Sequence, residues 1–174
     1  MNLEELRSYK NQFFGDILTD EKIVHLIDPD MPLQNADKLM YDNVYPSLYV
    51  PDTVEQAKTF VCCDVDFQVA NVRQIGDKQL YYCPIMYVWI FTHKSLMKIP
   101  DGGFRVDELA IGITDKIAGS KFYTMGALTL YSAKRFAPMV DFVGKVLAFN
   151  GRDWNEPSAE NPNRPIPSNR RAGV

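Results

Sequence analysis

The run from Ile85 to Phe91, Ile-Met-Tyr-Val-Trp-Ile-Phe, is apolar at every position. Successive side chains of a strand point to opposite faces of a sheet, so a strand of this kind is buried on both sides. A strand buried on both sides lies in the interior of a sheet, with a neighbour along each edge. We therefore predict a central strand over residues 85–91.

A second strand is predicted just before it, because apolar and polar residues alternate strictly from Phe60 onward. One side carries Val61, Cys63, Val65, Phe67 and Val69, and the other carries Cys62, Asp64, Asp66 and Gln68. This alternation is typical of a half-buried strand. Gly76-Asp77 supplies a turn or the tip of a longer loop between the two strands.

Helical spacing is clearest in residues 104–118, after the break at Pro100-Asp101-Gly102-Gly103. The apolar residues at positions i, i+3, i+4, i+7 and i+11 are Val106, Leu109, Ala110, Ile113 and Ile117. An amphipathic helix is also predicted over about residues 3–15, fraying at Gly15. A second short helix follows, with Thr19 or Asp20 as its N-cap and Asp28-Pro29 at its end.

The rest of the chain completes an α+β domain. Residues 28–57 contain Pro29, Pro32, Pro46 and Pro51, which predicts a long irregular connection with one extended piece, Val44 to Val50. Two strands, at about 127–137 and 140–149, are expected to form a hairpin around Pro138-Met139, unless the proline marks an edge or a bulge.

We predict a mainly antiparallel sheet of four to five strands with the order α-β-β-α-β-β. An N-terminal helix or helical hairpin and one central helix pack on it. Residues 1–152 form the single domain, and residues 153–174, rich in proline and arginine, form an extended C-terminal arm.

Composition excludes several classes of partner. The chain has 174 residues, 46% of them hydrophobic, and a net charge of −3, so it lacks the basic field that attracts duplex DNA or anionic lipid. It shows neither a signal-peptide pattern nor a membrane span, so we expect a protein made and used in the cytosol. Cys62, Cys63 and Cys83 lack the C-x-x-C spacing of redox or zinc sites and are expected to be reduced, buried thiols.

Catalytic patterns are weak. Asp64 and Asp66 share one strand face and are able to bring two carboxylates to a metal, but no histidine, third carboxylate or basic partner stands at a fixed spacing from them. His25 and His93 are not accompanied by a nucleophile motif, and Gly102-Gly103 lacks the rest of a phosphate-binding pattern. We expect no catalytic, cofactor-binding or metal-binding residues and no cofactor.

Two features favour assembly instead. The sheet is predominantly apolar, and too few helices are predicted to cover both of its faces. The rings of the segment Tyr81, Tyr82, Tyr87, Trp89 and Phe91 lack the interleaved Lys or Arg expected of a base-stacking surface, so they belong to the core or to a subunit interface. An uncovered face must meet a neighbour, and a heterologous contact repeated around an axis closes a ring.

The predicted order of elements resembles that of phage tail-completion and tail-terminator proteins of the minor tail family. The proline-flanked segment Tyr45-Pro46-Ser47-Leu48-Tyr49-Val50-Pro51 and the aromatic element Val88-Trp89-Ile90-Phe91 are similar to segments of those proteins. The helix from Phe104 to Ala118 and the closing strands from Leu128 to Phe149 resemble their helix and last strands. The stretch Phe13 to Leu39 and the arm are longer than in the shortest members, which leaves open a neck, head-completion or stopper protein.

The resemblance implies a virion structural protein, not an enzyme, at the neck or head-proximal end of the tail and assembled in the host cytoplasm. It implies a homo-oligomeric ring, commonly of six subunits, that caps the tail tube and meets tail-tube protein and a head-tail connector or stopper protein. DNA would pass through its lumen without sequence-specific contacts, and no membrane is involved. The residues expected at the interfaces are Gln74, Asp77, Lys78, Gln79, Arg164, Arg170 and Arg171.

Three alternatives remain at this stage. A neck or head-tail connector subunit, possibly twelve-fold, shares the composition and differs in its partner. A small metal-dependent nuclease or hydrolase would use Asp64 and Asp66. A cellular binding module, with the long loop as its ligand site, would be a stable monomer.

Overall fold

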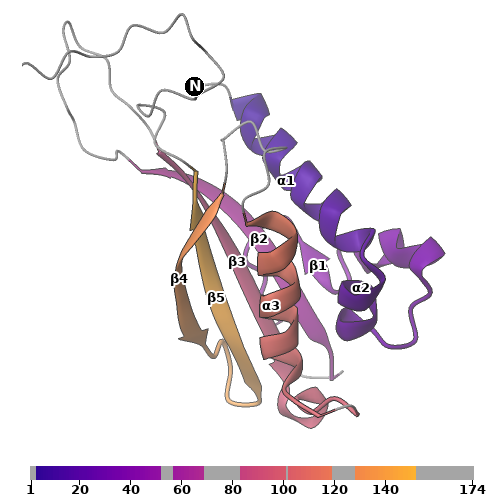
Figure 1. The fold of residues 1–174 in the computed structure, drawn as a ribbon. Coiled ribbons are helices and arrows are strands. Elements are labelled where there is room, and N and C mark those ends of the chain that lie inside the picture. The colour runs from indigo at the N-terminus through magenta and orange to yellow at the C-terminus, as the bar shows by residue number, and fades with distance from the viewer. Residues whose placement is uncertain (1–2, 52–56, 69–82, 101, 119–127, 152–174) are drawn as a thin grey trace, which may run out of the picture.

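A computed structural model describes residues 3–51, 57–68, 83–100, 102–118 and 128–151. They form a five-stranded sheet in the order β1-β2-β3-β5-β4 (Figure 1). All neighbouring strands are antiparallel except β1 and β2, which are parallel. The predicted α+β class and mainly antiparallel sheet are therefore confirmed. The strands are β1 (Val44–Tyr45), β2 (Thr59–Gln68), β3 (Cys83–His93), β4 (Thr129–Phe136) and β5 (Phe142–Asn150).

The α-helices of the described residues lie on one face of this sheet (Figure 1). They are α1 (Leu3–Leu18), α2 (Glu21–Ile27) and α3 (Arg105–Ile117), accompanied by the 3-10 helices η1 (Leu33–Leu39) and η2 (Lys94–Leu96). The main core fills the space between helices and sheet. α3 contributes the residues that the helical spacing predicted, and they are all buried: Val106, Leu109, Ala110, Ile113 and Ile117.

β3 is the central strand, as predicted, and is paired along its length with β2 and β5. Met86, Val88 and Ile90 are fully buried in the core under the helices. Trp89 and Phe91 point to the opposite face and pack in a second apolar cluster. Apolar side chains on both faces of one strand explain why the run from Ile85 to Phe91 contains no charged residue.

The start of the chain differs from the prediction in one respect. α1 does not end near Gly15 but continues to Leu18, because Ile17 is fully buried and holds the last turn on the core. The second helix begins as predicted: the side chain of Asp20 accepts a hydrogen bond from the N–H of Ile23 at 3.2 Å. Asp28 ends that helix.

The connection over residues 28–57 is more ordered than predicted. It contains η1, whose Ala36 and Leu39 are buried, and the extended piece is a strand only at Val44–Tyr45. Two buried positions three apart were too short a pattern to predict a helix. The closing hairpin of β4 and β5 is confirmed, with Pro138 in its turn and a separate bulge at Leu130/Ser132.

Arg105 joins three elements on the helical side. Its guanidinium donates hydrogen bonds to the carbonyl of Leu26 at 2.6 Å, near the end of α2, and to that of Leu96 at 2.8 Å, in η2. Only 6% of the residue is exposed. Burial lowers the pKa of Arg105, and nearby Asp28 acts in the opposite direction. The side chain thus satisfies a terminal helix carbonyl that the helix itself cannot satisfy.

We expect Arg105→Met to lower the free energy of unfolding by about 2–4 kcal/mol, because a buried and a part-buried carbonyl lose a charged donor. Urea denaturation followed by circular dichroism measures the change. Lys22→Met is the control, since it removes an exposed ion pair with Glu108 (3.2 Å) and should cost less than about 1 kcal/mol. Equal effects of the two substitutions would contradict the role given to Arg105.

We expect Gly144→Ala to destabilise the protein by about 1–3 kcal/mol, the usual cost of overpacking. A Cβ at this position of β5 would overlap the carbonyl oxygen of Ile90 and lie 2.6 Å from the Cβ of Phe91. Gly15→Ala is the matched control, because a Cβ there meets nothing within 4 Å and lies inside α1. It should raise the denaturation midpoint, so a fall in both variants would argue against a packing cause.

Candidate assembly surface

The sheet face that points away from the helices, here called the open face, is the candidate site. Its composition follows from the strand register, which places Asp64 opposite Tyr87, Cys62 opposite Trp89 and Phe60 opposite Phe91. On the other side of β3, Val146 pairs with Trp89 and also with Lys134 of β4. Aromatic and aliphatic groups therefore lie side by side over the middle strands, with charged groups toward β2 and β4.

Part of the open face forms a buried group of its own, which we call the aromatic cluster. Phe60, Cys62, Phe91 and Phe142 are buried there, and Tyr45, Trp89, Phe136 and Met139 pack against them. The rings of Phe60 and Phe91 are stacked with centroids 5.1 Å apart. The ring of Phe142 lies 5.9 Å and 5.8 Å from them. This cluster is a second, smaller core on the side of the sheet that the helices do not reach.

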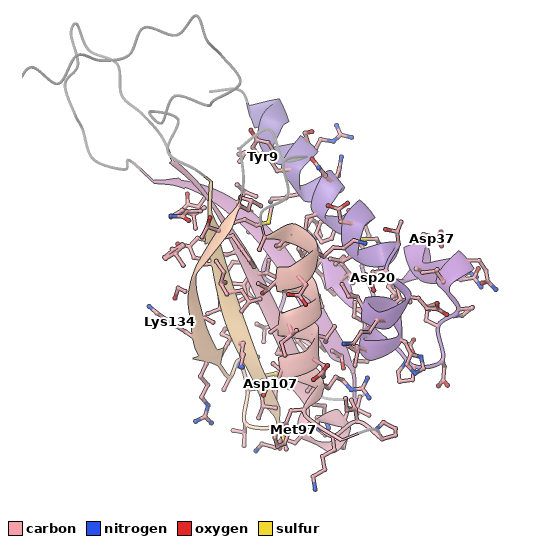
Figure 2. The ribbon with its side chains drawn as sticks, viewed as in Figure 1. Tyr9, Asp20, Asp37, Met97, Asp107 and Lys134 are labelled. Carbon is pink, nitrogen blue, oxygen red and sulfur yellow. The ribbon has the colours of Figure 1, made fainter. Side chains whose placement is uncertain are left out.

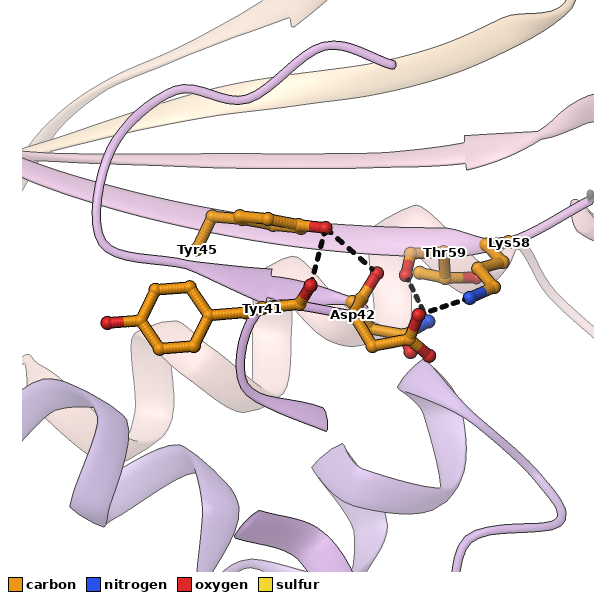
Figure 3. A network of polar contacts seen from close by, with 6 residues as sticks. Tyr41, Asp42, Tyr45, Lys58 and Thr59 are labelled. Atoms are coloured by element: carbon orange, nitrogen blue, oxygen red, sulfur yellow. Dashed lines mark hydrogen bonds and ion pairs between the residues drawn. The ribbon is translucent and has the colours of Figure 1, made fainter. Parts of the chain in front are cut away.

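The tyrosines after η1 extend the cluster to the β1 edge. The rings of Tyr45 and Tyr49 stack at 4.1 Å, and Tyr41 meets Tyr45 edge-on at 6.4 Å. The hydroxyl of Tyr45 donates to the carbonyl of Tyr41 at 2.8 Å, as Figure 3 shows. Burial, and next the neighbouring Tyr49, raise the pKa of Tyr45. The segment that carries Tyr49 crosses the open face, since the thiol of Cys62 donates to the Tyr49 carbonyl at 3.8 Å.

Polar contacts hold this edge in register. Lys58 forms an ion pair with Asp42 (Figure 3). The side-chain amide of buried Asn43 donates to the carbonyl of Thr59 at 2.9 Å, and the hydroxyls of Thr59 and Thr92 are 2.8 Å apart. These bonds connect the turn before β1 with β2 and β3. They fix the position from which the segment with Tyr45 and Tyr49 starts to cross the sheet.

The rest of the open face, here called the half-buried patch, lies toward the end of β5. Tyr87, Trp89 and Val146 are half-buried there, whereas Ile85 and Ala148 of the same face are buried. The rings of Tyr87 and Trp89 stack at 5.8 Å. Asp64 and Asp66 border the patch on β2, and exposed Lys134, labelled in Figure 2, borders it on β4. Among the described elements, the helices pack on the opposite face. An apolar surface with a charged rim has the composition of an interface.

The carboxylate of Asp64, considered above as half of a metal site with Asp66, has partners that hold the fold together. Asp64 accepts a hydrogen bond from the N–H of Val65 at 2.8 Å and forms an ion pair with Lys10 of α1 at 2.5 Å. Asp66 is exposed. In the part of the chain that the structure describes, no three His, Cys, Asp or Glu side chains are grouped so that they could hold a metal.

The two histidines lie apart from each other. His25 is exposed on α2, whereas His93 ends β3 and caps η2. The Nδ1 atom of His93 is 2.7 Å from the Ser95 hydroxyl, and its ring meets that of Phe142 edge-on. His93 thus leads the chain out of the sheet, as expected. Gly102 and Gly103 have φ of 87° and 96°, which identifies a turn.

The interface residues predicted from the sequence lie outside the described residues and stay predictions: Gln74, Asp77, Lys78, Gln79, Arg164, Arg170 and Arg171. The aromatic cluster was not predicted as a unit. The tyrosines at positions 45 and 49 are visible in the sequence as aromatic residues close together. Their place over the sheet is not, because the contact of Tyr49 with Phe60 depends on where the loop crosses the sheet. Sequence periodicity contains no information on that crossing.

Fold and surface together define a class: an α+β domain with one layer of helices on a mainly antiparallel sheet and a smaller aromatic core on the other face of the sheet. The chain belongs to the YomW family, a phage-derived family whose model matches residues 17–150, more than half of the sequence. No curated protein matches it. A chain of a solved structure described as "Virion of native gene transfer agent (GTA) particle" is similar at 13% identity and a TM-score of 0.45, over 83% of this chain and 94% of that chain. None of the described helices is long and apolar enough to cross a membrane.

We expect the thiol of Cys62 to be unreactive toward a disulfide reagent at pH 8 and to become reactive in Tyr49→Ala. Burial raises the pKa of Cys62 to about 11 and that of Cys63 further, so both thiols stay protonated, and the Tyr49 segment shields Cys62. The measurement is thiol titration in a Cys83→Ser background, with Tyr131→Ala as an exposed aromatic control. Reaction of Cys62 in the control would mean that the segment does not protect it.

Proposed function

We propose that this protein is a structural subunit of a phage virion that acts in tail completion as the tail terminator. It forms a ring that caps the tail tube and meets the head connector. The observation that carries the proposal is the half-buried patch of the open face, where Tyr87, Trp89 and Val146 lie between the charged residues of β2 and β4. Aromatic and aliphatic groups with a polar rim are typical of a protein contact.

Two further observations support a role in a virion. The chain belongs to a phage-derived family, and its element order resembles that of tail-completion and tail-terminator proteins. The functional event in this proposal is assembly, with binding energy concentrated in buried aromatic anchors.

The proposed ring needs a contact that joins two different surfaces of the same subunit, which gives a ring when its rotation closes and an open filament when it does not. The resemblance to tail-terminator proteins implies six copies, and a net charge of −3 agrees with DNA that passes through the lumen without being held. A neck or connector subunit would use the same kind of contact with a different ring size, so the mass of the assembly separates the two roles.

We expect light scattering behind size exclusion to give a species of about 119 kDa, six times the 19.9 kDa of the chain, alone or after addition of tail-tube protein. Val146→Lys, which adds a charge to the half-buried patch, should shift the protein to the monomer. Ile111→Lys, at a site on α3 that is 52% exposed, is the matched control and should assemble normally. Circular dichroism confirms that each variant is folded.

A wild-type chain that stays at 19.9 kDa both alone and with tail-tube protein would contradict the proposal. A closed ring of about twelve copies would support the connector role instead. Loss of assembly in both lysine variants would show that the effect is not specific to the open face.

A further inference from the structure

We infer that the β1 edge of the sheet, with the exposed ring of Tyr41 at its centre, binds the β4 edge of a second copy of this chain. The inference rests on the proposed function, because it names the two different surfaces that neighbouring ring subunits bring together. The two edges lie at opposite ends of one sheet, in the order β1-β2-β3-β5-β4. A contact between them is heterologous, as a ring requires.

Tyr41 has a backbone conformation that a tyrosine rarely adopts. Its φ of 64° lies in the left-handed region, where glycine and asparagine are at home. The N–H of Tyr41 donates to the carbonyl of Val44 at 2.8 Å, and its own carbonyl accepts from the hydroxyl of Tyr45 at 2.8 Å. These bonds involve only the backbone of Tyr41, and 70% of the residue is exposed. Strained positions cluster at functional sites, so the exposed ring points to a role outside the turn.

The ring of Tyr41 belongs to an exposed aromatic surface. It meets Tyr45 edge-on, Tyr45 stacks on Tyr49, and both Tyr49 and the neighbouring Leu48 are exposed. Figure 3 shows the ring of Tyr41 pointing away from the polar contacts of Tyr45 and Asp42. We call Tyr41, Tyr45, Leu48 and Tyr49 the tyrosine edge. Tyrosine is a frequent anchor of protein interfaces, because it supplies a large contact area with few rotatable bonds.

The tyrosine edge lies in an acidic part of the chain. Residues 28–49 contain one lysine and four aspartates, a net charge of −3: Lys38, Asp28, Asp30, Asp37 and Asp42. Lys58, which pairs with Asp42, reduces this charge only to −2. A partner surface that complements this edge is therefore basic.

The β4 edge of the same chain is basic. β4 contains Lys134 and Arg135 and no acidic residue, and we call these two residues the basic edge. Successive side chains of a strand point to opposite faces, so the two cations lie on either side of β4. Both are exposed, and in the part of the chain that the structure describes neither forms an ion pair. Figure 2 shows Lys134 and Asp37 on opposite sides of the molecule.

The two edges suit each other chemically. An ammonium or guanidinium group is attracted to the face of a tyrosine ring, and aspartates near the ring add to the attraction. The contact uses side chains and does not require an added strand, since β1 has two residues and β4 is bulged between Leu130 and Ser132. Lys134 also borders the half-buried patch, so the contact adjoins the surface on which the proposed ring depends. A second copy is the occupant because this chain itself carries the complement.

The test uses two full-length variants that each lack one side of the contact. Tyr41→Asn removes the ring and keeps the turn, because asparagine tolerates the left-handed conformation. The second variant combines Lys134→Glu with Arg135→Glu and reverses the charge of the basic edge. We expect each variant to raise the dissociation constant between subunits at least about tenfold, measured by light scattering over a dilution series.

A mixture of the two variants tests whether the contact is heterologous. The protein concentration is set between the dissociation constants of the wild-type and variant contacts, where each variant alone is a monomer. The mixture should form a dimer of about 40 kDa, twice the 19.9 kDa of the chain. The reason is that the tyrosine edge of one variant and the basic edge of the other remain intact, so that one contact forms and none follows.

Two matched substitutions serve as controls and should leave assembly unchanged. Phe104→Asn removes an aromatic ring that is 48% exposed, at the N-cap of α3, where asparagine is a favourable residue. Lys98→Glu reverses an exposed charge in the loop between η2 and α3. Circular dichroism should show that Tyr41→Asn does not lower the denaturation midpoint, which a purely structural role of the ring would do.

Crosslinking identifies the partner of Tyr41. A photo-crosslinking phenylalanine at position 41, in a mixture of isotopically light and heavy chains with tail-tube protein, should join the peptide with Lys134 and Arg135 of another chain. A crosslink to any other peptide or to the tube protein would overturn the inference, as would a variant mixture that stays monomeric. Rings that form unchanged in both variants would overturn it and leave the proposed function intact. A wild-type chain that never assembles would contradict both.

Discussion

Burial on both faces of β3 is the constraint from which the rest of the architecture follows. Met86, Val88 and Ile90 require a cover on one side of the sheet, and Trp89 and Phe91 require one on the other. The helices supply the first cover. The chain provides the second from the Tyr45–Pro51 segment and the turn after β4, and Trp89 stays half-buried beside them. A large aromatic side chain contributes about 2 kcal/mol or more when it is buried, so a contact that buries the rest of Trp89 is favourable.

The sequence predicted those parts of the fold that depend on local periodicity. α3 and β2 were located within a residue or two, and the central place of β3 followed from its composition. The errors lie where distant contacts decide the outcome. α1 runs past Gly15 because Ile17 reaches the core, and β1 is a strand only because it pairs with Val61 and Cys62 of β2.

The candidate surface shows the same division between local and distant information. Sequence reasoning indicated an uncovered sheet face, because helices were too few for the apolar strands. It did not identify the aromatic cluster, which forms when Phe60, Phe91 and Phe142 come together from three strands. Nor did it indicate that Asp64 pairs with Lys10, a contact across 54 positions of the chain. Through that ion pair, the carboxylate of Asp64 helps to link β2 to α1.

The edges of the sheet explain why assembly through the face is favoured over addition of a strand. At one edge, β1 is only two residues long. The ammonium group of Lys10 lies next to it, where it donates to the carbonyl of Pro46 at 2.9 Å and forms an ion pair with Asp64. At the other edge, β4 is bulged between Leu130 and Ser132 and carries exposed Lys134 and Arg135. Short strands, bulges and charges are the devices that block edge-to-edge pairing. These features disfavour the addition of a strand at β1 or β4, so the half-buried patch of the open face is the surface on which a specific contact gains from burial.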